Sequence, residues 1–296
     1  MTARLPHDEI KTIDHSRWNI IKRKAAQTQA CYAFALFEDH GIQPILIKGL
    51  AADLYYPASE FRDSVDMDIA VASKDFEAAK RINLSPEAKG LAIDLHCELR
   101  HLDTLGWAEL FERSESVLFD SGKIRILCPE DHLRVLSVHW LTDGGANKDR
   151  LRDIYYLIQN RPNNFDWDRF LNQVGNVRRR WLVCTVGLAK KFLGLDLSDT
   201  PIPDAADSLP PWLVKTVENE WSDVTPLRGL HACLDDRHMF VKQLKKRLPP
   251  NPICATVLMN GSFDAKTRIF YQIGTSLQRI GPSIANIAKG LLNRSK

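Results

Sequence analysis

The sequence predicts a protein of the α+β class, with a region of mixed strands and helices followed by an all-helical region. Three observations carry this prediction. Short apolar or alternating segments typical of strands occur before residue 128. Segments with helical periodicity separate them, and from residue 129 onward the periodicity is helical throughout. The change of pattern at Pro129 predicts a domain boundary between residues 1–128 and 129–296.

Length and composition are typical of an ordinary globular protein. A chain of 296 residues can bury a substantial core and form one large or two modest domains. The hydrophobic content of 44% and the charged content of 26% fit that class. A net charge of +3 is too small to indicate a nucleic-acid partner by itself, so no strong nucleic-acid signal is present.

The cysteines and the N-terminal residues favour a cytoplasmic protein. Six cysteines are scattered along the chain without a C-x-x-C pair, so neither a disulfide framework nor a zinc site is expected. The first residues carry no apolar core of a secretory signal. No apolar run approaches the ~20 residues that a membrane-spanning helix needs.

The first elements form a strand–turn–helix unit. Residues 16–40 show a helical apolar stripe, and Gly41 suits the left-handed position that ends a helix. The apolar run 44–47 is expected to be a buried strand, and residues 51–56 a short helix stopped by Pro57. Because a glycine turn before a helix exposes backbone N–H groups, this unit predicts an anion-binding turn to which Lys48 adds charge.

Residues 65–72 alternate as a strand does. Val65, Met67, Ile69 and Val71 share one face, whereas Asp66 and Asp68 share the other with alanines. Two like charges on a face of small residues predict a cation between them. Ser73 is expected to cap a helix over 74–82.

A second alternating segment, residues 91–99, places Asp94, His96 and Glu98 on one face. If this strand pairs with 65–72, Asp94 becomes a third carboxylate at the same place. His96 and Glu98 are expected to be structural. Residues 104–115 are expected to be helical, and residues 117–127 to form a hairpin turning at 120–122.

The second half is expected to consist of helices separated by a loop at 196–211. The predicted helices are 130–142, 149–160, 167–175, 178–193, 210–221 and 229–247. Residues 261–296 combine apolar residues at helical spacing with six Lys/Arg against one Asp. Residues 265–296 are therefore expected to pack on the body or on a homodimer partner, or to bind a membrane surface.

The acidic residues predict metal-dependent phosphoryl chemistry. Asp66, Asp68 and Asp94 are the expected catalytic and metal-binding residues, holding two Mg²⁺ ions or Mn²⁺ in their place. Such an ion pair can clamp the attacking and leaving oxygens of a phosphoryl transfer. Asp94 would also orient the attacking hydroxyl. Lys48 and Gly49 would hold phosphates, and Arg62 would offset the charge of the triphosphate.

The chain resembles the uncharacterised nucleotidyltransferase family of the polymerase-β superfamily over about residues 30–160. The resemblance implies a small mixed sheet flanked by helices, a helical domain after it, and two-metal transfer of a nucleoside monophosphate from an NTP, with ATP expected. The acceptor would be a small molecule, a peptide or a protein. The motifs that carry it are Ile47-Lys48-Gly49-Leu50, Tyr56-Pro57, Arg62, Asp66-x-Asp68-Ile69, Ile93-Asp94-Leu95-His96, Pro129-Glu130-Asp131-His132-Leu133, His139 and Arg152-Asp153-Ile154.

Two departures from the superfamily keep alternatives open. Lys48-Gly49 replaces the usual Gly-Ser turn, and the segment before Asp94 is shorter than is usual for the family. A catalytically degenerate binding or scaffold protein is therefore the first alternative. An Asp-x-Asp glycosyltransferase is a weaker one, because only about 65 residues precede the acidic pair, too few for the usual nucleotide-binding region of that class.

Overall fold

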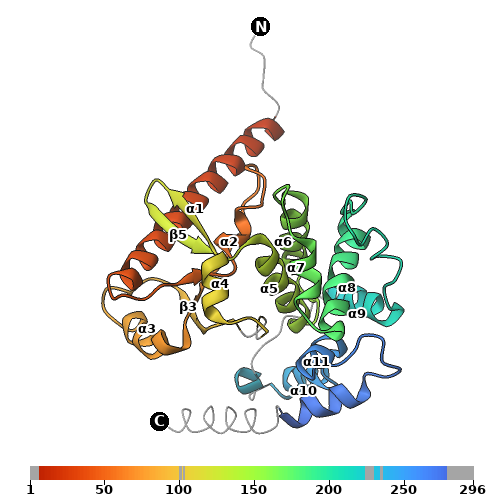
Figure 1. Ribbon diagram of the computed structural model, residues 1–296. Helices are drawn as coiled ribbons and strands as arrows, with labels where there is room; N and C mark the ends of the chain where they lie inside the picture. Colours follow the sequence, from red (N-terminus) through yellow and green to blue (C-terminus); the bar gives the residue numbers. More distant parts are fainter. Residues whose placement is uncertain (1–6, 100–101, 103, 224–229, 234–235, 279–296) are drawn as a thin grey trace. The chain divides into compact units, whose positions relative to one another are not determined.

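The computed structural model describes residues 7–99, 102, 104–223, 230–233 and 236–278, and it confirms the α+β class (Figure 1). The chain divides into two compact units. Unit 1 comprises Met1–Leu136 and Asp153–Gln173, and unit 2 comprises Ser137–Arg152 and Val174–Lys296. The functional division into 1–128 and 129–296 stays a prediction.

Unit 1 is built on a five-stranded mixed sheet with the strand order β3-β2-β1-β5-β4. Strand β1 pairs in parallel with β5 and antiparallel to β2, and β2 pairs in parallel with β3. Strands β4 and β5 form the predicted hairpin. Strand β4 lies at the edge of the sheet opposite β3. The strands are β1 (Ile45–Leu46), β2 (Met67–Val71), β3 (Ile93–Cys97), β4 (Glu115–Phe119) and β5 (Gly122–Ile126).

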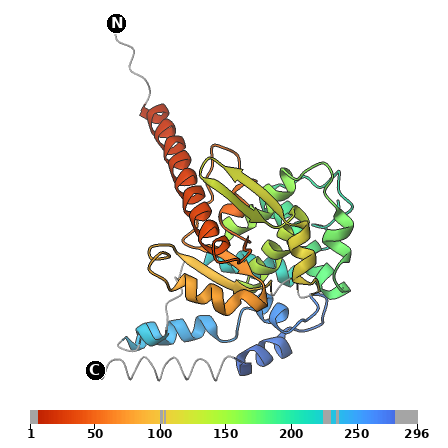
Figure 2. The ribbon, with the colours of Figure 1, turned by 60° about the vertical axis from the view of Figure 1, so that its left-hand side comes forward.

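One face of the sheet is covered by the first three helices, and α1 runs diagonally along it (Figures 1 and 2). These helices are α1 (His7–Glu38), α2 (Leu50–Asp53) and α3 (Phe76–Asn83). Ile69 and Val71 point into this core together with Leu46 and Ile126. The predicted apolar face is thus confirmed for Met67, Ile69 and Val71, whereas Val65 precedes β2 and is 94% exposed.

The opposite face is covered by α4 (Trp107–Arg113) and the start of α5 (Pro129–Thr142). Ala70 packs here with Ile45, Ile47 and Leu110. Ile69 and Val71 point into the first core, and side chains alternate between the two faces along a strand. The side chains of Asp68 and Ala70 therefore point to this second face. Leu99 also packs here, contrary to the predicted alternation, because β3 ends at Cys97 and Glu98 has a positive φ of 53°.

Three local predictions need correction. Ser73 does not cap a helix with its side chain; it begins a 3₁₀ turn (Ser73–Asp75) and its backbone N–H donates to the Glu98 carboxylate. The helix after Gly49 ends at Asp53, before the predicted residue 56. The hairpin turns at Asp120 and Ser121, because Gly122 already pairs with Phe119 in the ladder.

The remaining helices follow the predicted spacing, except that the predicted helix 229–247 is divided into a 3₁₀ turn and α10. They are α6 (Lys148–Gln159), α7 (Trp167–Asn172), α8 (Asn176–Leu193), α9 (Pro211–Ser222), the 3₁₀ turn Leu230–Cys233 and α10 (Arg237–Arg247). Helix α11 (Pro252–Leu258) was not predicted, and residues 269–278 are helical as well. None of the described helices is both long and apolar enough to cross a membrane.

Candidate metal centre

Two of the predicted acidic residues lie directly opposite each other in the sheet. Asp68 of β2 pairs with Asp94 of β3, and the next residues on the same face, Ala70 and His96, pair likewise. Because the two strands are parallel and in this register, the side chains of two paired residues point to the same face of the sheet. The predicted pairing of the two strands is confirmed, and it brings His96 to the same face as both carboxylates.

His96 lies between the two carboxylates. Its Nε2 atom is 3.0 Å from Asp68 Oδ1 and 3.3 Å from Asp94 Oδ2. One ligand atom from each of Asp68, Asp94 and His96 falls within 4.8 Å of the others. Two oxygens and one imidazole nitrogen at this spacing can bind a single divalent ion. We call these three residues the acidic–histidine cluster.

Lys48 supplies the balancing positive charge. Its Nζ lies 2.6 Å from Asp68 Oδ1, the same oxygen that faces His96. Burial by itself would raise the pKa of Asp68, but the hydrogen bonds from His96 and Lys48 and the positive charge of Lys48 outweigh it and lower that pKa. Asp68 is therefore held as a carboxylate, the form that a metal ion requires.

The cluster opens from a buried end to an exposed end. The Asp68 side chain is 9% exposed and the Lys48 side chain 13%, whereas Asp94 is 54% exposed. An ion held here would be fixed by a rigid buried ligand on one side and would leave positions toward Asp94 open to water or substrate. The donor set fits a divalent ion with open coordination positions.

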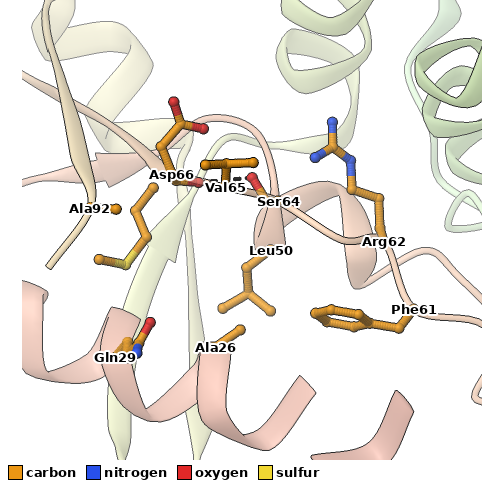
Figure 3. A pocket seen from close by; sticks show the side chains of 10 residues that line it. Ala26, Gln29, Leu50, Phe61, Arg62, Ser64, Val65, Asp66 and Ala92 are labelled. Carbon is orange, nitrogen blue, oxygen red and sulfur yellow. Dashed lines mark hydrogen bonds between the residues drawn. The ribbon is translucent and has the colours of Figure 1, made fainter. Parts of the chain in front are cut away.

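Asp66 does not join the cluster. It precedes the first residue of β2, it is exposed, and it is not among the described residues that group as metal ligands. It lines a small pocket of about 70 Å³ with Leu50, Phe61 and Arg62. Figure 3 shows the Asp66 carboxylate and the Arg62 guanidinium pointing away from the apolar side chains of Leu50 and Phe61. Its predicted metal role stays a prediction.

Arg62 is engaged by Asp153 of α6. The guanidinium donates to both carboxylate oxygens of Asp153 at 3.1–3.3 Å, and the Tyr56 hydroxyl donates to the same carboxylate at 2.6 Å. Burial would lower the pKa of Arg62, but the Asp153 charge and hydrogen bonds raise it. The structure thus pairs Arg62 with protein, and contact with a nucleotide stays a prediction.

Gly49 forms the turn between β1 and α2. Its φ of 61° is favoured by glycine, and a Cβ at this position would lie 2.9 Å from Ser64 Oγ. The turn therefore needs glycine for both conformation and space. Because α2 has only four residues, it offers a much weaker dipole to an anion than the longer helix that the sequence predicts.

The candidate metal ligand that sequence reasoning missed is His96. The alternation already placed it on the face of Asp94, but the distance to Asp68 depends on how β2 and β3 pair, which one sequence does not reveal. The available signal was a histidine on the same predicted strand face as Asp94 and Glu98, because histidine is the commonest metal ligand in proteins.

Comparison with known proteins assigns the chain to a family. A family model described as "Uncharacterised nucleotidyltransferase" matches residues 4–194, a segment that contains the whole acidic–histidine cluster together with Lys48, Gly49, Arg62 and Asp66. No curated protein and no solved structure matches the chain.

Proposed function

The chain belongs to the uncharacterised nucleotidyltransferase family, and on that premise we propose that it transfers a nucleoside monophosphate from an NTP to an acceptor at the acidic–histidine cluster. The observation that carries the proposal is the meeting of Asp68, Asp94 and His96 within 4.8 Å on two adjacent strands. A phosphoryl-transfer enzyme needs such a site to hold cations against the charge of a triphosphate.

The proposed metal is Mg²⁺, with Mn²⁺ as the closest substitute. Carboxylate oxygens suit both ions, and the imidazole of His96 adds a nitrogen ligand that Mn²⁺ accepts more readily than Mg²⁺. Bound divalent ions would neutralise phosphate charge and align the attacking and leaving oxygens. Asp66, exposed two residues before Asp68, is proposed to supply a ligand for a second ion once substrate is bound.

The chain's own residues have separate proposed tasks. Asp68 is the buried anchor, and its two hydrogen-bonded neighbours fix the direction of its carboxylate. Asp94, exposed at the open end of the cluster, can accept a hydrogen bond from an acceptor hydroxyl and orient it. Lys48 and the Gly49 turn are proposed to contact phosphates, since Lys48 can turn from Asp68 toward an incoming anion. Arg62 is proposed to add positive charge nearby.

We also propose an acceptor, a donor and a compartment. The proposed acceptor is a hydroxyl of a small molecule, a peptide or a protein, and ATP is the proposed donor. A cytoplasmic location is proposed because all six cysteines are free, which suits a reducing compartment. The glycosyltransferase alternative loses its support, because the family match is to nucleotidyltransferases.

The test is transfer of label from α-labelled NTPs, with Mg²⁺ or Mn²⁺ and a cell extract as the source of acceptors. Asp68→Asn and Asp94→Asn are expected to reduce labelling at least 100-fold, because each removes a charged ligand. Asp120→Asn is the matched control, since the Asp120 side chain is 95% exposed in a hairpin turn. Unchanged labelling in both cluster variants would overturn the proposal.

The binding-protein alternative gives a different result in the same preparation. A degenerate nucleotidyltransferase would bind NTP in a metal-dependent manner by calorimetry and label nothing in any extract. Binding without transfer would therefore assign the cluster to nucleotide recognition and reject the catalytic role.

A further inference from the structure

The helix at residues 269–278 presents its large apolar side chains to solvent. Ile269 is 59% exposed, Phe270 74%, Ile273 52% and Leu277 65%. These residues recur at three- and four-residue spacing and therefore lie along one side of the helix. Scattered exposed hydrophobic residues are normal, but a continuous stripe of four marks a surface that something covers. We call these four residues the outer stripe.

The opposite side of the same helix packs against the rest of unit 2 with small and polar residues and with the ring of Tyr271, which lies against Gly261. Thr275 is 1% exposed, and the Gln272 side chain donates to the Pro250 carbonyl at 2.7 Å. A Cβ at Gly274 would lie 2.7 Å from Met259 Cε, so the backbone approaches the body closely there. The four apolar side chains of the outer stripe thus point to solvent, whereas in an ordinary surface helix the apolar side faces the core.

The surrounding sequence is strongly basic. Residues 237–296 contain 11 Lys/Arg and one acidic residue, Asp264, which leaves 29 Lys/Arg against 36 Asp/Glu in residues 1–236. The small net charge of the whole chain conceals this separation. A basic segment attached to an acidic body indicates an anionic partner for that segment.

Helix α10 adds exposed basic residues at the same end of unit 2. Arg237, Lys242 and Lys245 are exposed, as are the apolar residues Val241 and Leu248. The hydrogen bond from Gln272 to Pro250 joins the outer-stripe helix to the segment that follows α10. In both views α10 and the helix at 269–278 lie along the lower edge of unit 2 (Figures 1 and 2).

We infer that α10 and the outer stripe form a docking surface for a lipid bilayer that carries anionic headgroups. Large apolar side chains together with lysines and arginines are typical of helices that lie in the interface of a membrane. The apolar side chains would enter the boundary between headgroups and acyl chains, and the basic side chains would contact lipid phosphates. The surface attaches the protein to one face of a membrane without spanning it.

Two other partners fit the observations less well. A nucleic acid would use the charge but would leave four large apolar side chains exposed, since phosphate contacts need no such stripe. A second copy of the chain would bury the stripe, but four side chains fall short of the roughly 800 Å² per partner that stable interfaces bury.

The test is flotation of the full chain with vesicles. Vesicles of phosphatidylcholine and phosphatidylglycerol in equal parts are compared with vesicles of phosphatidylcholine alone, at low and at high salt. Binding is expected to the anionic vesicles at low salt and to weaken strongly at high salt. Absence of binding to the anionic vesicles would overturn the inference.

Paired variants separate the two contributions. Lys242→Glu with Lys245→Glu is expected to weaken binding on the order of fivefold or more for each lysine, and Phe270→Ser with Ile273→Ser is expected to abolish it. The matched controls change exposed residues of unit 1. They are Lys74→Glu with Lys89→Glu, and Leu84→Ser with Leu118→Ser, where Leu84 is 85% and Leu118 81% exposed.

The remaining outcomes also decide the question. Vesicle binding that both surface variants retain would place the contact elsewhere and overturn the inference. Loss of a dimer in Phe270→Ser with Ile273→Ser, measured by light scattering without vesicles, would assign the outer stripe to self-association instead. Equal salt-sensitive binding to duplex DNA and to anionic vesicles would show a general preference for polyanions and reject a lipid-specific surface.

Discussion

The most isolated polar side chain in unit 1 belongs to His132 in α5. Its ring is fully buried, it packs near the ring of Tyr55, and neither nitrogen makes a hydrogen bond of normal geometry with a described residue. Burial lowers the pKa of His132 to about 3, and the positive charge of Arg62 acts in the same direction. The backbone of Ile47 raises this pKa more than the charge of Arg62 lowers it, but burial outweighs both.

This lowered pKa predicts acid sensitivity. The folded state keeps His132 neutral while the unfolded chain binds a proton below about pH 6.5, so stability is complete above that pH and falls as the pH decreases toward 3. The expected loss is about 1.4 kcal/mol of unfolding free energy per pH unit. His132→Leu should remove this part of the pH dependence in urea unfolding between pH 7.5 and 5.

The control for that experiment is His40→Leu, which changes an exposed histidine. It should leave the pH dependence of the wild type in place. If His132→Leu and the wild type lose stability in parallel on acidification, the buried neutral histidine is not the cause.

At the scale of elements, several side-chain hydrogen bonds hold the segment between α2 and β2 in place. Asp53 accepts hydrogen bonds from Arg23 of α1 and from the backbone N–H of Arg62, and Asp153 of α6 holds Arg62 and Tyr56. Because this segment leads directly into β2, these contacts position the residues before Asp68. We therefore expect this network to support the candidate metal centre.

Removing the central carboxylate should destabilise unit 1. In Asp153→Ala the Arg62 guanidinium, whose side chain is only 16% exposed, loses a buried partner that is 2% exposed. Breaking such a pair is expected to cost about 3–5 kcal/mol. Asp120→Ala, which breaks an exposed contact with Lys24, should cost at most about 1 kcal/mol in the same denaturant experiment. Equal effects of the two substitutions would contradict the supporting role.

The Gly49 turn offers a second test at this scale. Gly49→Ala must place a Cβ at a positive φ and 2.9 Å from Ser64 Oγ, which is expected to destabilise the protein by about 1–3 kcal/mol. Gly106→Ala is the matched control, because no atom lies within 4 Å of a Cβ there and its φ is −71°. Thermal unfolding compares the two, and similar melting temperatures would show that the turn tolerates a side chain.

For the whole molecule, local periodicity predicted the elements and their faces but not their pairing. The alternation placed Asp68 with Ala70 on one face of its strand and Asp94 with His96 on one face of its own, since the side-chain period of a strand is two. That these two faces coincide follows from the parallel register of β2 and β3. Asp66 was predicted to lie on the same strand, but β2 begins at Met67, so Asp66 directly precedes it and its metal role stays a prediction.

A single sequence could not predict which distant residues contact one another. Asp153, the partner of Arg62, lies 91 residues away, and the position of His96 beside Asp68 follows from strand register. The exposure of the outer stripe is likewise a tertiary property, because the composition of residues 265–296 was compatible with packing on the body, with a homodimer contact and with membrane binding.

The most direct test of the central claim is a Mn²⁺ titration followed by electron paramagnetic resonance, because it detects the metal centre without knowledge of the acceptor. The wild type should bind Mn²⁺, and Asp68→Asn, Asp94→Asn and His96→Leu should each weaken binding on the order of tenfold or more, whereas Asp120→Asn should not. Binding of Mn²⁺ with equal affinity by the wild type and all three cluster variants would contradict the account.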